Sequence, residues 1–193
     1  MIHGIVKFNE QALDYPQFLF CGSFNPIHAG HIAIADFIYE KYGVSVDFEI
    51  SIHNVEKPSI DFYEARKRFD LMEIIKRPSF SKLYITDDAR YLEKARQFPE
   101  VTFVCGFDTI AALCEGLYYK EEEFEEVIKE FEELEIEWLV FHRKKGNGQI
   151  SSADDFKDFN PRLLKNVTII NDFKPINVSS RELRLMPREL KDD

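Results

Sequence analysis

The chain has 193 residues, of which 45% are hydrophobic and 14% aromatic, and its formal net charge is -10. This length fits one domain of about 100 to 200 residues, and so many apolar side chains favour a packed core over disorder. The negative charge disfavours nucleic acids and anionic membranes as partners, because both require clustered Lys and Arg. We therefore expect one globular domain, with its core at about residues 17–186.

Short apolar segments alternate with helical patterns along the chain, as they do in parallel α/β folds. The predicted strands are residues 17–21, 46–52, 82–85, 101–105, 136–141 and 167–170, and the predicted helices are residues 32–42, 61–76, 89–97 and 121–134. The last of these helices is expected at the surface, with its many Glu residues in solvent. The fold class is therefore α/β: a Rossmann-like, doubly wound, mainly parallel sheet of five to six strands with helices on both faces.

Three cysteines, Cys21, Cys105 and Cys114, are odd in number and include no CxxC pair, so we expect neither a disulfide framework nor a zinc site. The sequence contains no run of 18 apolar residues and no N-terminal leader pattern of charged and then apolar residues. These features predict a cytoplasmic protein without a membrane span.

Residues 22–31, with the sequence GSFNPIHAGH, follow the first predicted strand and lead into a helical pattern. A helix N-terminus presents unpaired N–H groups and partial positive charge, so this turn suits an anionic ligand. His28 and His31 are three residues apart, which places them on one face of a first helical turn as donors to phosphate. A metal site on these two histidines is the alternative, but no third ligand follows at a suitable spacing, and we name no protein metal ligand.

The pattern Gly-x-Phe-x-Pro-x-His-x-Gly-His in this turn resembles the signature of the HxGH nucleotidyltransferase superfamily. Its members include nicotinamide and nicotinate mononucleotide adenylyltransferases, phosphopantetheine adenylyltransferase and cytidylyltransferases. The resemblance implies a core strand order of 3-2-1-4-5 and catalytic roles for His28 and His31 at the phosphates. The nucleotide-binding residues that it implies in this turn are Gly22, Ser23, Phe24, Asn25 and Gly30.

Residues 177–184 have the Ser-x-x-Glu spacing of a capping box and predict a second helix N-terminus. Alone, this is an ordinary capped helix. Beside the first motif it resembles the superfamily's second signature, Ile-Ser-Ser-Thr-x-x-Arg, which implies phosphate contacts from Ser179 and Ser180 and a catalytic role for Arg184. Val178 stands in place of Ile, and Arg181 replaces Thr, which removes a hydroxyl and adds a charge. Cytidylyltransferases usually have a different second signature, so adenylyl transfer is favoured.

Two further segments resemble parts of mononucleotide adenylyltransferases. Gly106 and Asp108 match the Gly-x-Asp segment that lines the nucleotide crevice, where Gly106 permits close approach of a ligand. Asp108 either accepts from ribose hydroxyls or caps the next helix, and Phe107 either stacks on a base or packs in the core. Lys57 lies where related enzymes place a lysine that binds the acceptor's phosphate, and an exposed surface lysine is the alternative.

The resemblance implies an enzyme that transfers AMP from ATP to a phosphorylated acceptor, nicotinamide or nicotinate mononucleotide, and releases pyrophosphate. Its partners are ATP and this small acceptor, and Mg²⁺ is expected as a cofactor bound through the ATP phosphates. The oligomeric state, a homo-oligomer included, stays open. Two alternatives remain: a related adenylyl- or cytidylyltransferase with another phosphorylated acceptor, and a non-catalytic nucleotide-binding protein, which the Arg181 departure suggests.

Overall fold

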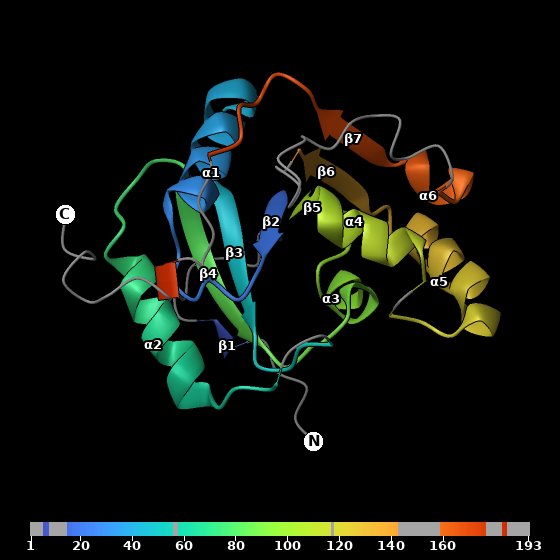
Figure 1. The fold of residues 1–193 in the computed structure, drawn as a ribbon, viewed down its shortest axis with the longest axis horizontal. Helices are drawn as coiled ribbons and strands as arrows, with labels where there is room; N and C mark the ends of the chain where they lie inside the picture. Colours follow the sequence, from blue (N-terminus) through green and yellow to red (C-terminus); the bar gives the residue numbers. More distant parts are fainter. Residues whose placement is uncertain are drawn as a thin grey trace.

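The computed structural model describes residues 6–7, 15–55, 58–116, 118–142, 159–176 and 183–184. Within these residues, seven strands form one sheet in the order β1-β4-β3-β2-β5-β6-β7 (Figure 1). The strands are β1 (Val6–Lys7), β2 (Phe18–Cys21), β3 (Val46–Ser51), β4 (Phe80–Thr86), β5 (Thr102–Gly106), β6 (Glu137–Phe141) and β7 (Val167–Ile170). β1 pairs with β4 in the antiparallel sense, and every other neighbouring pair is parallel.

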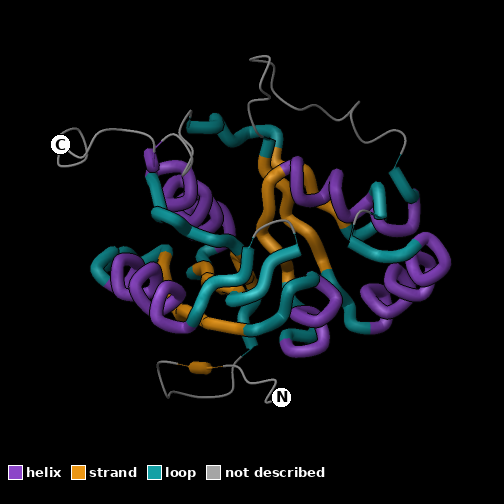
Figure 2. Tube along the Cα trace, turned by 60° about the horizontal axis from the view of Figure 1, so that its bottom comes forward, coloured by secondary structure: helices purple, strands orange, loops and turns teal. Residues whose placement is uncertain are grey.

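Helices cover both faces of this sheet, and Figure 2 shows the strands between two groups of helices. The helices are α1 (Ala29–Tyr42), α2 (Phe62–Glu73), α3 (Tyr91–Gln97), α4 (Phe107–Cys114), α5 (Glu121–Glu133) and α6 (Pro161–Leu164). Side chains of α1 and α2 pack on one face, and those of α3 to α6 pack on the other. The sheet is therefore buried on both sides, as the near-continuous apolar strands predicted.

The alternation of side chains along β2 shows how one strand serves two cores. Phe18 and Phe20 join the core under α1 and α2, whereas Leu19 between them joins the core under α3, α4 and α5. All three side chains are at most 7% exposed. Successive residues of a strand point to opposite faces, so each of the central strands contributes to both layers.

The Rossmann-like, doubly wound fold is confirmed. The six predicted strands are β2 to β7, and β2 lies between β3 and β5. The chain therefore reverses its direction of winding between β2 and β5, in agreement with the expected order 3-2-1-4-5. Ligands of such folds bind beyond the carboxyl ends of the two strands at this point.

Several elements differ from the sequence prediction. α4 and α6 were missed, because eight and four residues give too few turns for a helical period to stand out. β1 was missed because two residues carry no alternation. α1 begins at Ala29, three residues earlier than predicted, because His28 caps it, and α2 ends three residues early, at Glu73.

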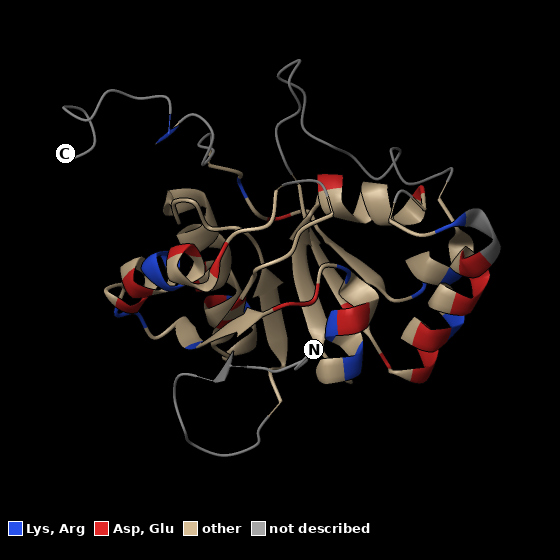
Figure 3. Cartoon of the chain, turned by 90° about the horizontal axis from the view of Figure 1, so that it is seen from below, with Lys and Arg blue, Asp and Glu red and all other residues tan. Residues whose placement is uncertain are grey.

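The Glu-rich helix α5 is a surface helix, as predicted. Val127, Ile128 and Phe131 are buried against the sheet, whereas Glu125 and Glu126 are exposed. Figure 3 shows acidic residues along this helix at the edge of the molecule. Among the described residues, none of the helices combines the length and the apolar character that crossing a bilayer requires.

Candidate functional site

The turn between β2 and α1 holds two histidines in stacked rings. His28 is the N-cap of α1, and its Nδ1 accepts from the Gly30 N–H at 3.2 Å. His31 Nδ1 accepts from the His28 N–H at 3.3 Å, and the two ring centroids are 3.7 Å apart. A ring nitrogen that accepts from a backbone N–H has no proton, so the neutral rings are protonated at Nε2. Both histidines are therefore oriented as Nε2–H donors at a helix N-terminus.

Phe24 fixes the shape of this turn. Its φ of 39° is in the left-handed region, which a bulky residue rarely adopts, and its side chain is 2% exposed. The ring packs against Phe20, Phe48 and the edge of His31 at centroid distances of 5.0 to 5.5 Å. A Cβ at Gly22 would lie 2.9 Å from the Phe24 ring, so this position requires glycine. Burial of Phe24 thus offsets the backbone strain and holds the His31 ring in place.

Two arginines from distant parts of the chain hold the same turn. Arg68 of α2, whose side chain is 11% exposed, donates to the Ser23 carbonyl at 3.1 Å. Arg184 donates to the Asn25 carbonyl, and 159 residues separate the two in the sequence. The structure therefore brings Arg184 to the histidine turn. Arg68 also forms an ion pair with Glu64 at 3.0 Å, and both arginines lie beside the place where an anion would meet the helix.

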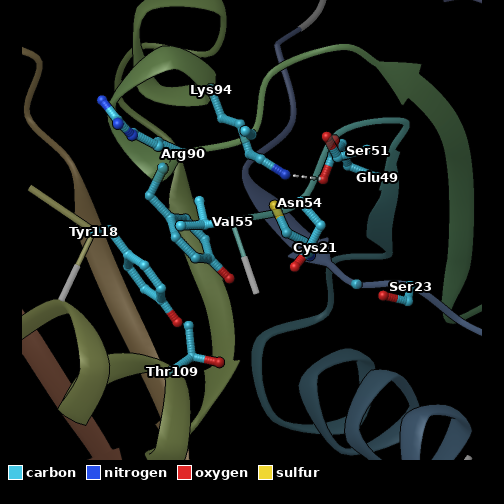
Figure 4. A pocket seen from close by; sticks show the side chains of 13 residues that line it. Cys21, Ser23, Glu49, Ser51, Asn54, Val55, Arg90, Lys94, Thr109 and Tyr118 are labelled. Carbon is cyan, nitrogen blue, oxygen red and sulfur yellow. Dashed lines mark hydrogen bonds and ion pairs between the residues drawn. The ribbon is translucent and has the colours of Figure 1, made fainter. Parts of the chain in front are cut away.

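A cavity of about 160 Å³ opens beside this turn, at the carboxyl ends of β2 and β3 and the N-terminus of α3 (Figure 4). Gly22 and Ser23 line both the turn and the cavity. The other lining residues are Cys21, Glu49, Ser51, Asn54, Val55, Ala89, Arg90, Tyr91, Lys94, Thr109 and Tyr118. The cavity therefore lies at the carboxyl edge of the sheet, where the doubly wound fold predicts a ligand.

A buried ion pair forms one wall of the cavity. Lys94 Nζ lies 2.6 Å from Glu49 Oε2, and the two side chains are 7% and 0% exposed (Figure 4). Thr86 of β4 donates its hydroxyl to the other Glu49 oxygen. Burial by itself would lower the pKa of Lys94, but the charge and hydrogen bond of Glu49 outweigh it, and the pKa is raised. The ammonium is therefore charged and held at the cavity wall.

Uncharged groups and Arg90 complete the lining. Cys21 is half-buried, and burial raises the pKa of its thiol well above the usual value. Tyr91 and Tyr118 add aromatic rings, and Lys94 Nζ lies 5.8 Å from the Tyr91 centroid. The Arg90 guanidinium lies 5.7 Å from the Tyr119 ring, and in Figure 4 the side chain points away from the Glu49–Lys94 pair. The lining of the cavity thus combines aromatic rings, a thiol, the Glu49–Lys94 ion pair and the Arg90 side chain.

The predicted residues of the Gly-x-Asp segment lie at the same edge of the sheet. Gly106 ends β5 and is the N-cap of α4, and a Cβ there would meet no described atom within 4 Å. Asp108 is exposed in the first turn of α4, whose N-cap is Gly106, so of the two alternatives for Asp108 the capping one was wrong. Phe107 packs against the core, as the packing alternative predicted, and the centroids of the Phe107 and Phe159 rings are 6.3 Å apart. Lys57, Ser179, Ser180 and Arg181 fall outside the described residues.

Sequence analysis missed Arg68, Glu49 and Lys94. Arg68 lies in the predicted helix 61–76, where its sequence context does not distinguish it from a surface charge such as Arg66. Lys94 lies between the buried residues Leu92 and Ala95 of α3, which is an unusual place for a lysine. In the sequence, Lys94 stands at a position where the helical period predicts an apolar residue. This was the one local indication that Lys94 has a buried partner.

The fold is that of a doubly wound α/β protein with its candidate site at the carboxyl edge of the sheet. The chain belongs to the cytidylyltransferase-like family, whose model matches residues 19–186. It is 39% identical over 57 residues to a probable nicotinate-nucleotide adenylyltransferase of Bacteroides fragilis. That match spans 29% of this chain and 28% of the relative.

The fold is similar to a solved structure of Plasmodium falciparum nicotinic acid mononucleotide adenylyltransferase complexed with NaAD. The TM-score is 0.55 with 21% sequence identity, and the match covers 86% of this chain and 81% of the other. At this identity the likeness establishes the fold.

Proposed function

We propose that this protein is an adenylyltransferase that transfers AMP from ATP to a pyridine mononucleotide and releases pyrophosphate. The observation that carries the proposal is the contact of Arg184 with the Asn25 carbonyl. It joins the segment of the second motif to the histidine turn of the first, as a site that holds a triphosphate from two sides requires. Membership in the cytidylyltransferase-like family and the name of the Bacteroides relative support the same class of reaction.

In this proposal the histidine turn binds the α-phosphate. The acceptor phosphate attacks the phosphorus of that group in line, and pyrophosphate leaves, so no covalent enzyme intermediate forms. Negative charge on the phosphoryl oxygens is stabilised by the Nε2–H donors of His28 and His31 and by the Arg184 guanidinium. Because Nδ1 of each histidine is held by a backbone N–H, these donors are positioned before the substrate arrives.

The two substrates take different places beside this turn. The open space at Gly106 suits the close approach of a nucleotide, and the cavity next to Ser23 suits the ring of the acceptor. Gly22 and Ser23 line the cavity and immediately precede the turn, so a phosphate on the bound acceptor reaches the histidines over a short path. We extend to Lys57 the role of binding that phosphate, and to Ser179 and Ser180 contacts with the phosphates of ATP.

Mg²⁺ is proposed to enter with ATP. The residues described at the turn supply nitrogen donors and backbone carbonyls rather than a cluster of carboxylates, which fits a metal held mainly by phosphate oxygens and water. When bound, the ion neutralises phosphate charge. The three cysteines are free thiols, which agrees with a reducing compartment such as the cytoplasm.

Release of pyrophosphate tests the proposal. The assay supplies ATP or CTP with each of four acceptors: nicotinamide mononucleotide, nicotinate mononucleotide, phosphopantetheine and glycerol phosphate. We expect turnover with ATP and a pyridine mononucleotide, and a loss of about 100-fold or more in kcat for His31→Ala, which should keep its fold. Wild-type turnover in the variant contradicts the role of His31, and ATP binding without turnover on any acceptor contradicts the enzyme assignment.

A further inference from the structure

We infer that the outer face of α2 binds the same face of a second copy of this chain, and that the two helices pack antiparallel about a two-fold axis. Four residues in line form this face, which we call the α2 seam: Tyr63, Lys67, Asp70 and Ile74. The inference concerns association between chains, so it goes beyond the proposed function and does not depend on it.

The α2 seam lies on the side of the helix that faces away from the sheet. Ala65, Phe69 and Met72 are the buried residues of α2, and they belong to the core under this helix. Tyr63 and Ile74 are instead 68% and 73% exposed, and α2 lies at an outer edge of the molecule (Figure 1). Two large apolar side chains are thus held in water on one face of a short helix.

The residues of the α2 seam have the spacing of a coiled-coil contact. They follow one another at intervals of four, three and four residues, which keeps them in one line along a helix. Ile74 is the C-cap of α2, but its φ of -68° and ψ of -25° are helical, so it continues this line. Leu71, 54% exposed, flanks the seam and widens its apolar part. A second helix can therefore pack along the seam.

The charges in the middle of the seam specify the partner and its direction. When two copies of α2 run antiparallel and cross at the middle of the helix, Tyr63 of each copy faces Ile74 of the other, and Lys67 faces Asp70. Both ends of the contact are then apolar, and both central contacts join opposite charges. In a parallel pair each residue would face its own copy, so that like charges meet. The seam is therefore complementary to itself, as a two-fold contact requires.

Contacts within each chain leave the two charged groups suited to this pairing. Lys67 Nζ lies 4.5 Å from the centroid of the Tyr63 ring, so the ammonium is held over the seam. Arg66 Nε donates to Asp70 Oδ1 at 2.6 Å, and the Asp70 side chain is 53% exposed. A carboxylate accepts several hydrogen bonds, so Asp70 can also accept from the Lys67 ammonium of a second chain.

A lipid surface suits the α2 seam less well than a second copy does. A helix that binds an anionic membrane has Lys and Arg along its apolar face, whereas this seam has a carboxylate near its centre and the chain has a net charge of -10. The seam is short, and two acidic chains repel each other. We therefore expect a dimer that dissociates in the micromolar to sub-millimolar range, as small transient interfaces do.

Sedimentation equilibrium of the full chain at several concentrations and physiological ionic strength tests the inference. The average mass should rise with concentration from one chain to two and no further, because a two-fold contact is closed. Ile74→Glu should raise the Kd of the dimer at least about tenfold, since each substitution removes an apolar contact at both ends of the seam. Ile176→Glu is the matched control. Ile176 is 46% exposed in the segment after β7, so its substitution should leave the Kd unchanged.

An exchange of charges tests the pairing of Lys67 with Asp70. Lys67→Asp places carboxylates opposite each other at both central contacts and should raise the Kd at least about tenfold. Adding Asp70→Lys makes these contacts complementary again, so the double variant should return to within about threefold of the wild-type Kd.

Three results would overturn the inference: a monomer at every concentration, a dimer unchanged by Ile74→Glu, or a double variant as weak as Lys67→Asp. Vesicles that contain phosphatidylserine test the other partner. Binding of the wild-type chain but not of Ile74→Glu to these vesicles, without self-association, would overturn the second copy in favour of a lipid surface. None of these results bears on release of pyrophosphate, so the proposed function is tested separately.

Discussion

Lys94→Met should destabilise the protein far more than the loss of an exposed lysine. Lys94 and Glu49 are 7% and 0% exposed, and in the variant the buried carboxylate keeps only uncharged partners, the Thr86 hydroxyl and the Cys21 thiol, among the described residues. Removing one partner of a buried ion pair costs about 3 to 5 kcal/mol of unfolding free energy. For a domain of this size each kcal/mol lowers Tm by about 2 to 4 °C, so we expect a fall of about 6 to 20 °C.

Urea unfolding of the wild-type and variant proteins measures this loss, with Lys129→Met as the control. Lys129 and Glu133 form an exposed pair on α5, with side chains 69% and 62% exposed, so the control should change the unfolding free energy by less than about 0.5 kcal/mol. Adding Glu49→Gln to Lys94→Met should recover much of the loss, because no buried charge is then left alone. If Lys94→Met and Lys129→Met lowered the unfolding free energy equally, the buried Glu49–Lys94 pair would be refuted.

The pH dependence of these proteins gives an independent check. The folded-state pKa of Lys94 is raised, so the stability from this pair is fully present below the unfolded-state pKa of about 10.4 and is lost as pH rises through the folded pKa. The stability deficit of Lys94→Met relative to the wild type should therefore shrink as the pH rises above about 10.4. A deficit that grows as the pH rises through this range contradicts the assignment.

Two further pairs of variants test the histidine turn. Gly22→Ala should lose about 1 to 3 kcal/mol of unfolding free energy, because its Cβ would lie 2.9 Å from the buried Phe24 ring, whereas Gly106→Ala should keep its stability and lose activity. Equal unfolding free energies of Gly22→Ala and Gly106→Ala would show that the Phe24 ring moves to accommodate a Cβ at residue 22 without cost. Arg68→Met should lower kcat/KM for ATP about tenfold, and Arg66→Met, on the exposed side of α2, should not; equal kinetics would mean that Arg68 is structural only.

The fold was predictable because its information is local. Each central strand is a short apolar run bounded by turn residues, and each long helix repeats its apolar residues at a period that a single segment reveals. α4 shows the limit of this method. Its sequence from Phe107 to Cys114 directly follows Gly106, the last residue of β5, so one apolar stretch contains both a strand and a helix. Only the β2–β5 and β5–β6 pairings show where the strand stops.

The histidine turn could be predicted from a local motif, whereas the cavity depends on contacts between distant parts of the chain. His28, Gly30 and His31 bond to one another within four residues, so the pattern of the turn contains its own geometry. Glu49 has partners 37 and 45 residues away, at Thr86 and Lys94. In β3, alternating acidic and apolar residues are typical of a strand with one face in solvent, yet both faces are buried. The local sequence does not distinguish a strand with one face in solvent from a strand buried on both faces. The difference here depends on Lys94 of α3, which pairs with the buried Glu49.

This difference separates two properties of the proposed enzyme. The donors to the phosphates come from the histidine turn and Arg184, whereas the groups that face the acceptor ring come from β3, α3 and the residues after α4. Among the described residues, Gly22 and Ser23 belong to both sets. The bonds that hold His28, His31 and Arg184 are made within the histidine turn and to Asn25, so substitutions elsewhere in the cavity lining leave these bonds in place. For the same reason the sequence motifs predict the class of reaction but not the acceptor, whose selection depends on residues outside them.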